Sequence, residues 1–334
     1  MTASRWFMGL DGGATKTHCV LYDMQQDKLM AACGGPINHE VLEKGMESLP
    51  GAIMGIVTPL LKQAGIGVEE LDGASFGMAG VDTPMQHQII SGILEEMGFR
   101  RFVLANDACL GVKAECDGFG VSAVNGSGYS VVGISPTGEM LQIGGHNYMS
   151  GDQGGGCYLV PSTIRAAYTQ LYKLGPETAI TYRLFEWLGI SDRAEFSEAM
   201  ALRIMAGEAE AYQDISQVLY RCAAEGDLEA LKILTACGED YALSVKSVSR
   251  ELKIPEPVEV VLVGSHFTKC ECTHAIDTLR NSLKAAGDYN IRVISTAPVA
   301  GALFWAMEEA GCTPNENKRR ELRERLRHPE RSCL

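Results

Sequence analysis

The feature that most constrains the fold is an order of strands and helices that occurs twice along the chain. In the first hundred residues, the spacing of apolar residues predicts three strands joined by tight turns, then a helix, a strand, a second helix and a strand. These predicted segments are residues 6–10, 18–22, 28–33, 41–64, 74–78, 84–97 and 102–105. The order can be written βββαβαβ.

A comparable order begins again near Gly118. Its predicted segments are strands 120–124, 129–134 and 139–143, strand 258–263, helix 275–286, strand 291–295 and helix 298–310. Between its third strand and the rest lies a helical block of about residues 157–252, which we interpret as an insertion. Two copies of one order, without close sequence repetition, predict two α/β lobes with a cleft between them.

The expected domains follow from these two copies. We predict an N-terminal lobe over residues 1–115 and a C-terminal lobe over residues 116–312, followed by a basic tail at 313–334. In the tail, Leu322 and Leu326 stand at helical spacing, and acidic residues interleave with the basic ones. We expect a terminal helix that docks on the first lobe through its leucines; binding of an anionic partner is the alternative.

Composition and charge exclude several classes of function. Hydrophobic residues make up 46% and charged residues 21% of the chain, which is typical of a globular enzyme. The 29 basic and 42 acidic side chains give a net charge of −13, which repels nucleic acid and anionic lipid. No apolar stretch is long enough to span a bilayer, and the N-terminus does not resemble a signal peptide. We therefore expect a cytoplasmic protein without nucleic-acid or membrane partners.

The first candidate site is the turn Gly9-Leu-Asp-Gly-Gly-Ala-Thr-Lys-Thr17 between the first two strands. It is not a Walker P-loop, because a threonine stands where glycine should precede Lys-Thr and a strand follows it. Paired glycines let backbone N–H groups approach an anion, hydroxyls and a lysine add to this, and an aspartate at a strand end can hold Mg²⁺ through water. A bare Gly-Gly hairpin is usually only a turn. The residues expected to form this phosphate loop are Asp11, Gly12, Gly13, Thr15, Lys16 and Thr17.

The second half carries a corresponding hairpin, Asn125-Gly-Ser-Gly128, in which Gly126 and Ser127 would hold phosphates from the opposite lobe. The spacing of its residues is weakly specific. The main support for this role is that the hairpin follows the first strand of the second copy, as the first loop does in the first copy. A nucleotide's adenosine could pack on Gly264 and Ser265, after an apolar strand, and on Gly301 in the last helix of this copy. Either of these two elements alone is more often helix–sheet packing.

Asn106 and Asp107 directly follow the strand at 102–105 and precede a predicted helix. A carboxylate at this place can accept the proton of an attacking hydroxyl, which is the general-base role in phosphoryl transfer. The alternative is an ordinary helix N-cap. Two phosphate loops in the same chain favour catalysis by Asp107.

Glycines are dense at Gly144-Gly145-His146 and again from Gly151 to Gly156. Bare backbone here would admit a ligand, and Asp152 can accept hydrogen bonds from hydroxyl groups. A flexible hinge is the alternative.

In order, these segments resemble the phosphate-1, connector, phosphate-2 and adenosine elements of the sugar kinase/actin/Hsp70 superfamily, over about Gly9 to Met307. The fullest resemblance is to the N-acetylglucosamine kinases, also classed with the BadF/BadG/BcrA/BcrD ATPase-type domain. The shared motifs are Gly12–Thr17, Gly35–His39, Gly77–Gly80, Asn106-Asp107 and Gly151–Gly154.

The resemblance implies two ribonuclease-H-like, actin-like ATPase lobes with a central cleft and a helical insertion in the second lobe. It implies ATP and Mg²⁺ as cofactors, and phosphorylation of a hydroxyl on an amino sugar such as N-acetylglucosamine or glucosamine. Asp107 would be the base, and the residues expected to contact the sugar are Asn38, His39, Asp107, Gly145, His146 and Asp152. For Asn38 and His39 the alternative is a helix N-cap before Glu40.

Three motifs depart from the family pattern. Where the family has Gly-Trp-Gly, this chain has Gly145-His-Asn147. In the family's Gly-Asp-Glu-Gly motif, Gln153 replaces the glutamate, and the family's Gly-Thr-Gly-Ser is Gly-Ser-Gly-Tyr at residues 126–129. The phosphoryl-transfer motifs are therefore better preserved than the sugar contacts, and the acceptor need not be N-acetylglucosamine.

The family resemblance leaves alternatives open. Some members are ATPase activators of 2-hydroxyacyl-CoA dehydratases or benzoyl-CoA reductases, which hold an iron–sulfur cluster between two subunits. Cys109 and Cys116 lie near the expected lobe junction, but the Gly-Cys-Gly-type setting of such a cluster is absent. A sensor without catalysis is a third reading, which the presence of Asp107 disfavours. The helical insertion offers a surface for a homodimer.

Overall fold

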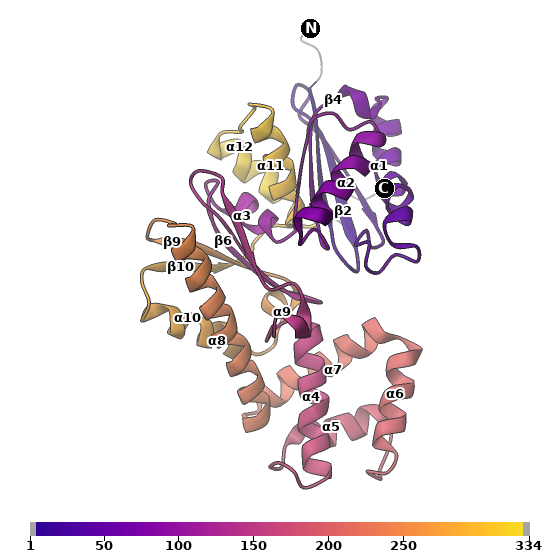
Figure 1. The fold of residues 1–334 in the computed structure, drawn as a ribbon, viewed down its shortest axis with the longest axis vertical. Helices are drawn as coiled ribbons and strands as arrows, with labels where there is room; N and C mark the ends of the chain where they lie inside the picture. The colour runs from indigo at the N-terminus through magenta and orange to yellow at the C-terminus, as the bar shows by residue number, and fades with distance from the viewer. Residues whose placement is uncertain (1–4, 330–334) are drawn as a thin grey trace. The chain divides into compact units, whose positions relative to one another are not determined.

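The computed structural model describes residues 5–329, and the first half of the chain forms a five-stranded sheet in the order β3-β2-β1-β4-β5 (Figure 1). β2 pairs antiparallel with β1 and β3, whereas β1, β4 and β5 run parallel to one another. These strands confirm the predicted ones, with an earlier start for β4. Their bounds are β1 (Trp6–Gly12), β2 (Thr17–Asp23), β3 (Lys28–Gly34), β4 (Leu71–Met78) and β5 (Phe102–Ala105).

The helices of the first half are α1 (Leu49–Ala64), α2 (Pro84–Glu96) and α3 (Cys109–Glu115), with short 3-10 turns η1 (Gly45–Ser48) and η2 (Val68–Glu70). The expectation of one helix from residue 41 was wrong. Turns and bends occupy residues 39–44, and α1 has Pro50 in its first turn. Proline favours that position because its missing N–H would have no partner there.

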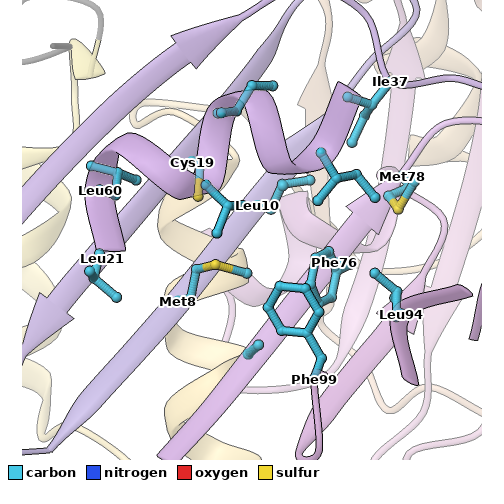
Figure 2. Close-up of a cluster of buried hydrophobic side chains, with 14 of the residues drawn as sticks. Met8, Leu10, Cys19, Leu21, Ile37, Leu60, Phe76, Met78, Leu94 and Phe99 are labelled. Atoms are coloured by element: carbon cyan, nitrogen blue, oxygen red, sulfur yellow. The ribbon is translucent and has the colours of Figure 1, made fainter. Parts of the chain in front are cut away.

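The alternation of side chains along β1 places a core on each face of the first sheet. Met8 and Leu10 point into a cluster with residues of α1 and α2, including Leu60 and Leu94 (Figure 2). Phe7 points to the opposite face, where α11 (Val299–Glu309) packs. Figure 1 shows the same two layers, with α1 and α2 on one side of the sheet and α11 on the other. The first sheet is therefore a buried layer with helices on both sides.

The second sheet has the order β10-β9-β6-β7-β8, so read from β8 it repeats the order of the first sheet from β3. The predicted duplication is confirmed at the level of strand order. The strands are β6 (Gly120–Asn125), β7 (Tyr129–Ile134), β8 (Met140–Ile143), β9 (Val258–Val263) and β10 (Tyr289–Val293), and two helices, α9 (Ser265–Thr268) and α10 (His274–Lys284), lie between β9 and β10.

The predicted helical insertion is also confirmed, and it follows β8 and a short turn, η3 (Asn147–Met149). Its helices are α4 (Gly156–Leu171), α5 (Ala179–Leu188), α6 (Phe196–Ala206), α7 (Glu208–Ala224) and α8 (Leu228–Glu251). Within residues 5–329, no helix is both long and apolar enough to cross a membrane.

The described chain divides into two compact units. The first comprises residues 5–122, 132–141 and 294–329, and the second comprises residues 123–131 and 142–293. The unit boundaries cross strands of the second sheet, and the first unit includes the C-terminal helix α12 (Glu316–Arg325). Compactness and element order are different criteria, so the lobe boundaries expected after residues 115 and 312 remain a prediction.

Helix α12 is held in the first unit by its leucines and by several basic side chains, among which Arg319 is the buried one. Leu322 and Leu326 are buried in the cluster that contains Phe304. The side chain of Arg319 donates to Glu308 Oε1 at 2.9 Å and to the carbonyl oxygen of Lys113 at 2.8 Å, and its guanidinium lies 4.6 Å from the centre of the Phe304 ring. The guanidinium group of Arg319 on α12 therefore contacts both α3 and α11.

We predict that Arg319→Ala destabilises the first unit. Arg319 is only 6% exposed, so its removal leaves buried acceptors without their donor, at a cost of roughly 2–4 kcal/mol in the free energy of unfolding. Urea unfolding followed by tryptophan fluorescence measures this. The control is Arg320→Ala on the exposed side of the same helix, which should change the free energy by less than about 0.5 kcal/mol. Equal effects of the two substitutions would contradict the assignment.

Candidate active site

Three aspartates converge at one edge of the first sheet. Asp11 on β1 is paired with Gly77 on β4, which in turn is paired with Ala105 on β5. Because these strands are parallel neighbours, the segments that leave their carboxyl ends start at the same edge. Asp82 follows β4 and Asp107 follows β5, so both join Asp11 there.

The neighbouring charges change the acidity of Asp107. Its carboxyl is largely withdrawn from water, and the carboxylates of Asp11 and Asp82 lie close enough to repel its charge; together these effects raise its pKa to about 7. A hydrogen bond from the backbone N–H of Ala108 opposes part of this rise. A carboxyl group with this pKa can take up and release a proton near neutral pH, as a general base must.

Asn106 holds the turn that carries Asp107. It is 7% exposed, its Oδ1 accepts a hydrogen bond from the backbone N–H of Ala108 at 2.9 Å, and its Nδ2 donates to Asp82 Oδ1 at 2.9 Å. Helix α3 has Ala108 at its N-cap and no side-chain cap. Asp107 is therefore not the N-cap of α3, and the alternative reading of this residue was wrong.

The first phosphate-loop candidate is a tight turn between β1 and β2. The backbone N–H of Gly13 donates to the carbonyl oxygen of Lys16 at 3.0 Å and closes the turn. No hydrogen bond in the described part of the chain uses the backbone N–H groups of Ala14, Thr15 or Lys16. The side chains of Thr15 and Lys16 are exposed. The turn thus offers three backbone donors and an ammonium group to an anion.

Two residues of this candidate loop have structural partners. Thr17 is buried, and its hydroxyl donates to the carbonyl oxygen of Gly35 at 2.7 Å, which differs from the expectation that it donates to a phosphate. Gly12 is also buried, and a Cβ added to it would lie 2.2 Å from Ile37 Cδ1. Both residues attach the turn to the segment that leads to Asn38.

The Asn38-His39 segment lies against the end of β4. Asn38 is 6% exposed, and its Oδ1 accepts a hydrogen bond from the backbone N–H of Glu40 at 2.9 Å. Gly80 has a φ of 82°, and a Cβ there would lie 2.5 Å from Asn38 Oδ1 and 3.0 Å from His39 Nδ1. The structure therefore brings this segment to the turn that carries Asp82. Helix α1 begins only at Leu49, so the helix N-cap reading of Asn38 was wrong.

In the second unit, the hairpin Asn125–Gly128 is also closed by a backbone hydrogen bond, although over two residues and not three. The backbone N–H of Gly126 donates to the carbonyl oxygen of Gly128 at 3.1 Å. Asn125 Oδ1 accepts from the backbone N–H of Gly155 at 2.8 Å, which joins the hairpin to the glycine-rich start of α4. Ser127 is exposed at the tip.

Gly264 meets the same hairpin. Its φ is 98°, and an added Cβ would lie 2.3 Å from the carbonyl oxygen of Asn125, so glycine is required there. Ser265 follows and is exposed. Gly301, by contrast, lies in the first unit, where an added Cβ would lie 2.2 Å from the carbonyl oxygen of Leu110; packing of α11 on α3 accounts for this glycine.

Asp152 shapes the loop in which Gly145 and His146 lie. Its Oδ2 accepts hydrogen bonds from the backbone N–H groups of Gly145 at 3.0 Å and Asn147 at 2.9 Å. Its Oδ1 makes no hydrogen bond within the described residues. His146 is exposed. The three predicted residues are thus close together, with one carboxylate oxygen left for a ligand.

Sequence reasoning missed three polar residues near these sites. Asp82 follows a strand just as Asp11 and Asp107 do, so this position could have identified it. Asp240 on α8 accepts a hydrogen bond from the backbone N–H of Gln153 at 3.2 Å, and burial raises its pKa. Burial lowers the pKa of His266 to about 4. His266 lies three residues after β9, so the same strand-end position could have identified it, whereas Asp240 lies within the long helix α8, where its position gives no such signal.

Comparison with known proteins assigns the chain to a family and a fold. The model for the BadF/BadG/BcrA/BcrD ATPase family matches residues 8–306. An N-acetylmuramic acid/N-acetylglucosamine kinase from Clostridium acetobutylicum is 23% identical over 252 residues, 75% of this chain and 81% of its own. An N-acetyl-D-glucosamine kinase from Dictyostelium discoideum is 23% identical over 269 residues, 77% of this chain and 83% of its own.

A solved structure from Chromobacterium violaceum, provisionally named an N-acetylglucosamine kinase, has the same fold. It superposes with a TM-score of 0.69 at 22% identity and covers 90% of this chain and 98% of its own. The predicted α/β fold of two ribonuclease-H-like lobes is therefore confirmed.

We predict that Asp107→Asn becomes more stable relative to the wild type as the pH rises. The pKa of Asp107 is about 7 in the folded chain and about 4 when unfolded, so its contribution to stability is present below pH 4 and is lost as pH rises to 7. Relative to the wild type, the variant should gain roughly 2 kcal/mol in the free energy of unfolding between pH 5 and pH 8. Urea unfolding at both pH values measures this. The exposed Asp288→Asn should show no gain, and the same flat result for Asp107→Asn would contradict the shift.

Proposed function

Because this chain belongs to the BadF/BadG/BcrA/BcrD ATPase family, we propose that it is an ATP-dependent kinase that phosphorylates a hydroxyl group of a sugar. The observation that carries the proposal is Asp107, a carboxyl group with a pKa of about 7 at the carboxyl edge of a sheet beside Asp11. The two relatives named as N-acetylglucosamine kinases support a sugar as acceptor.

In this proposal Asp107 acts as general base. As a carboxylate it accepts the proton of the sugar hydroxyl while that oxygen attacks the γ-phosphorus of ATP, and a base with a pKa near the working pH combines the right protonation state with sufficient basicity. Asn106 keeps the carboxyl in place through its two hydrogen bonds.

The first loop fits a phosphate ligand. The unused backbone N–H groups of Ala14, Thr15 and Lys16 and the exposed ammonium of Lys16 would bind phosphate oxygens of ATP. In the second unit we assign the same role to Gly126 and Ser127, and the adenosine to Gly264 and Ser265. Gly301 was also predicted to line the adenosine site, but its packing against α3 gives that role no support.

Asp11 fits a Mg²⁺ ion held through water. Mg²⁺ usually keeps several waters and takes phosphate oxygens as ligands, so one carboxylate at the end of β1 would be enough to hold it. When bound, Mg²⁺ would neutralise charge on the phosphates.

For the acceptor we propose an amino sugar such as N-acetylglucosamine or glucosamine. Asn38 and His39 would contact it, because they lie against the turn that carries Asp82. In the second unit, Gly145, His146 and the Oδ1 oxygen of Asp152 are the proposed contacts. An imidazole in place of the family's tryptophan alters one apolar contact, so preference among amino sugars should differ from that of the named relatives.

A coupled ADP-release assay over hexoses, hexosamines and N-acylhexosamines tests the function. We expect ADP release that depends on an amino sugar, and a fall in kcat of roughly 10²–10⁴-fold for Asp107→Asn with the KM for ATP nearly unchanged, since only the base is lost. Asp288→Asn is the control with unchanged kcat. ATP hydrolysis independent of every sugar would refute the kinase and favour an ATPase activator, and turnover within a few-fold of wild type in Asp107→Asn would refute its role as base.

A further inference from the structure

We propose that Asp82 is a positioning residue for Asp107, because it holds Asn106 and with it the turn that presents Asp107 at the sheet edge. The inference rests on the proposed function and extends it to a residue that neither the motifs nor the family resemblance singled out.

Asp82 is itself firmly placed by the start of α2. Gln86 Oε1 accepts hydrogen bonds from the backbone N–H groups of Asp82 at 3.0 Å and Thr83 at 2.9 Å. The backbone N–H of Gln86 donates in return to Thr83 Oγ1 at 3.2 Å. This capping box fixes the backbone where β4 turns into α2, so the carboxylate of Asp82 projects from a rigid point.

From that point a hydrogen bond reaches the catalytic turn. Asp82 Oδ1 accepts from Asn106 Nδ2 at 2.9 Å, and the other end of the same amide, Oδ1, accepts from the backbone N–H of Ala108 at 2.9 Å. Asn106 is 93% buried (7% exposed), so an amide that lost Asp82 would have little water to replace it. Asp82 thus fixes the rotamer of Asn106, and Asn106 fixes the backbone on both sides of Asp107.

Asp82 also acts on Asp107 through its charge, which is a separate effect. The Asp82 carboxylate contributes to the raised pKa of Asp107, after desolvation and Asp11. Removal of this charge should therefore lower the pKa of Asp107. Other titratable or charged groups on the elements around Asp107 include His18 beside Asp11 and His87 on α2 against the Leu104 carbonyl oxygen. Helix α3 adds Cys109, Glu115 and Lys113, which pairs with Glu308 on α11, and β4 adds Asp72 at its far end.

Two substitutions separate the hydrogen bond that Asp82 accepts from Asn106 from the effect of its negative charge. Asp82→Asn keeps an oxygen that can accept from Asn106 but removes the charge, whereas Asp82→Ala removes both. We expect Asp82→Ala to lower kcat by roughly 10–100-fold, the usual effect of losing a residue that orients a catalytic group, with the KM for ATP within about twofold. Asp82→Asn should retain kcat at pH 8 within a few-fold, and the acid limb of its kcat/KM profile should move to lower pH.

The matched control is Asp72→Asn in the same β4 strand. Asp72 accepts a hydrogen bond from the backbone N–H of Trp6 at 3.0 Å and pairs with Arg5, at the opposite end of the strand from Asp82. This variant should leave both kcat and the acid limb unchanged. Full kcat in Asp82→Ala, or an acid limb that stays in place in Asp82→Asn, would overturn the inference.

A second measurement separates failure of this inference from failure of the proposed function. At pH 8, Asp82→Asn made in the wild-type protein should raise the free energy of unfolding. The same substitution made in the Asp107→Asn variant should not raise it, because the carboxylate that Asp82 repels is absent there. A wild type inactive with every sugar would refute the kinase alone. Equal effects of Asp82→Asn in both backgrounds would refute the link between Asp82 and Asp107 whatever the activity.

Discussion

The site depends on one electrostatic constraint, the placement of three carboxyl groups at one edge of a sheet. The charges of Asp11 and Asp82 disfavour ionisation of Asp107 and raise its pKa, so the cluster costs stability when Asp107 is ionised. The fold imposes the arrangement because β1, β4 and β5 are neighbouring parallel strands, and Asp11, Asp82 and Asp107 lie at or after their carboxyl ends. Helices packed on both faces of the sheet keep the strands in register.

Small residues allow the catalytic turn to lie so close to the sheet. A Cβ added to Gly77 on β4 would lie 2.5 Å from the Leu110 side chain, and one added to Gly301 on α11 would lie 2.2 Å from the Leu110 carbonyl oxygen. Helix α3 is thus held between a strand and a helix that approach it closely. At the far end of α3, Arg319 binds the Lys113 carbonyl oxygen. The turn that carries Asp107, directly before α3, is therefore held in place by contacts along this helix.

Much of this fold is predictable from sequence because strand periodicity is local information. All ten strands described here were predicted, although β4 starts earlier than expected and β10 lies two residues earlier. The start of α1 was displaced by a proline, whose effect is also local. The loops were found through glycines and an aspartate at strand ends. What sequence could not give is the partner of each polar group. The sequence predicts Thr17 to be a phosphate ligand, whereas in the structure its hydroxyl donates to the Gly35 carbonyl oxygen. The hydrogen bond between Asn106 and Asp82 depends on the parallel register of strands that are far apart in the chain.

The central claim is that Asp107 titrates near neutrality in the folded protein, and a direct titration of its carboxyl carbon tests it. Protein labelled with ¹³C at aspartate carboxyl groups, with Asp107→Asn to assign the signal, would be followed by NMR from pH 4 to pH 9. We expect a midpoint near pH 7 for this carbon. A midpoint near the ordinary aspartate value of about 4 would contradict it.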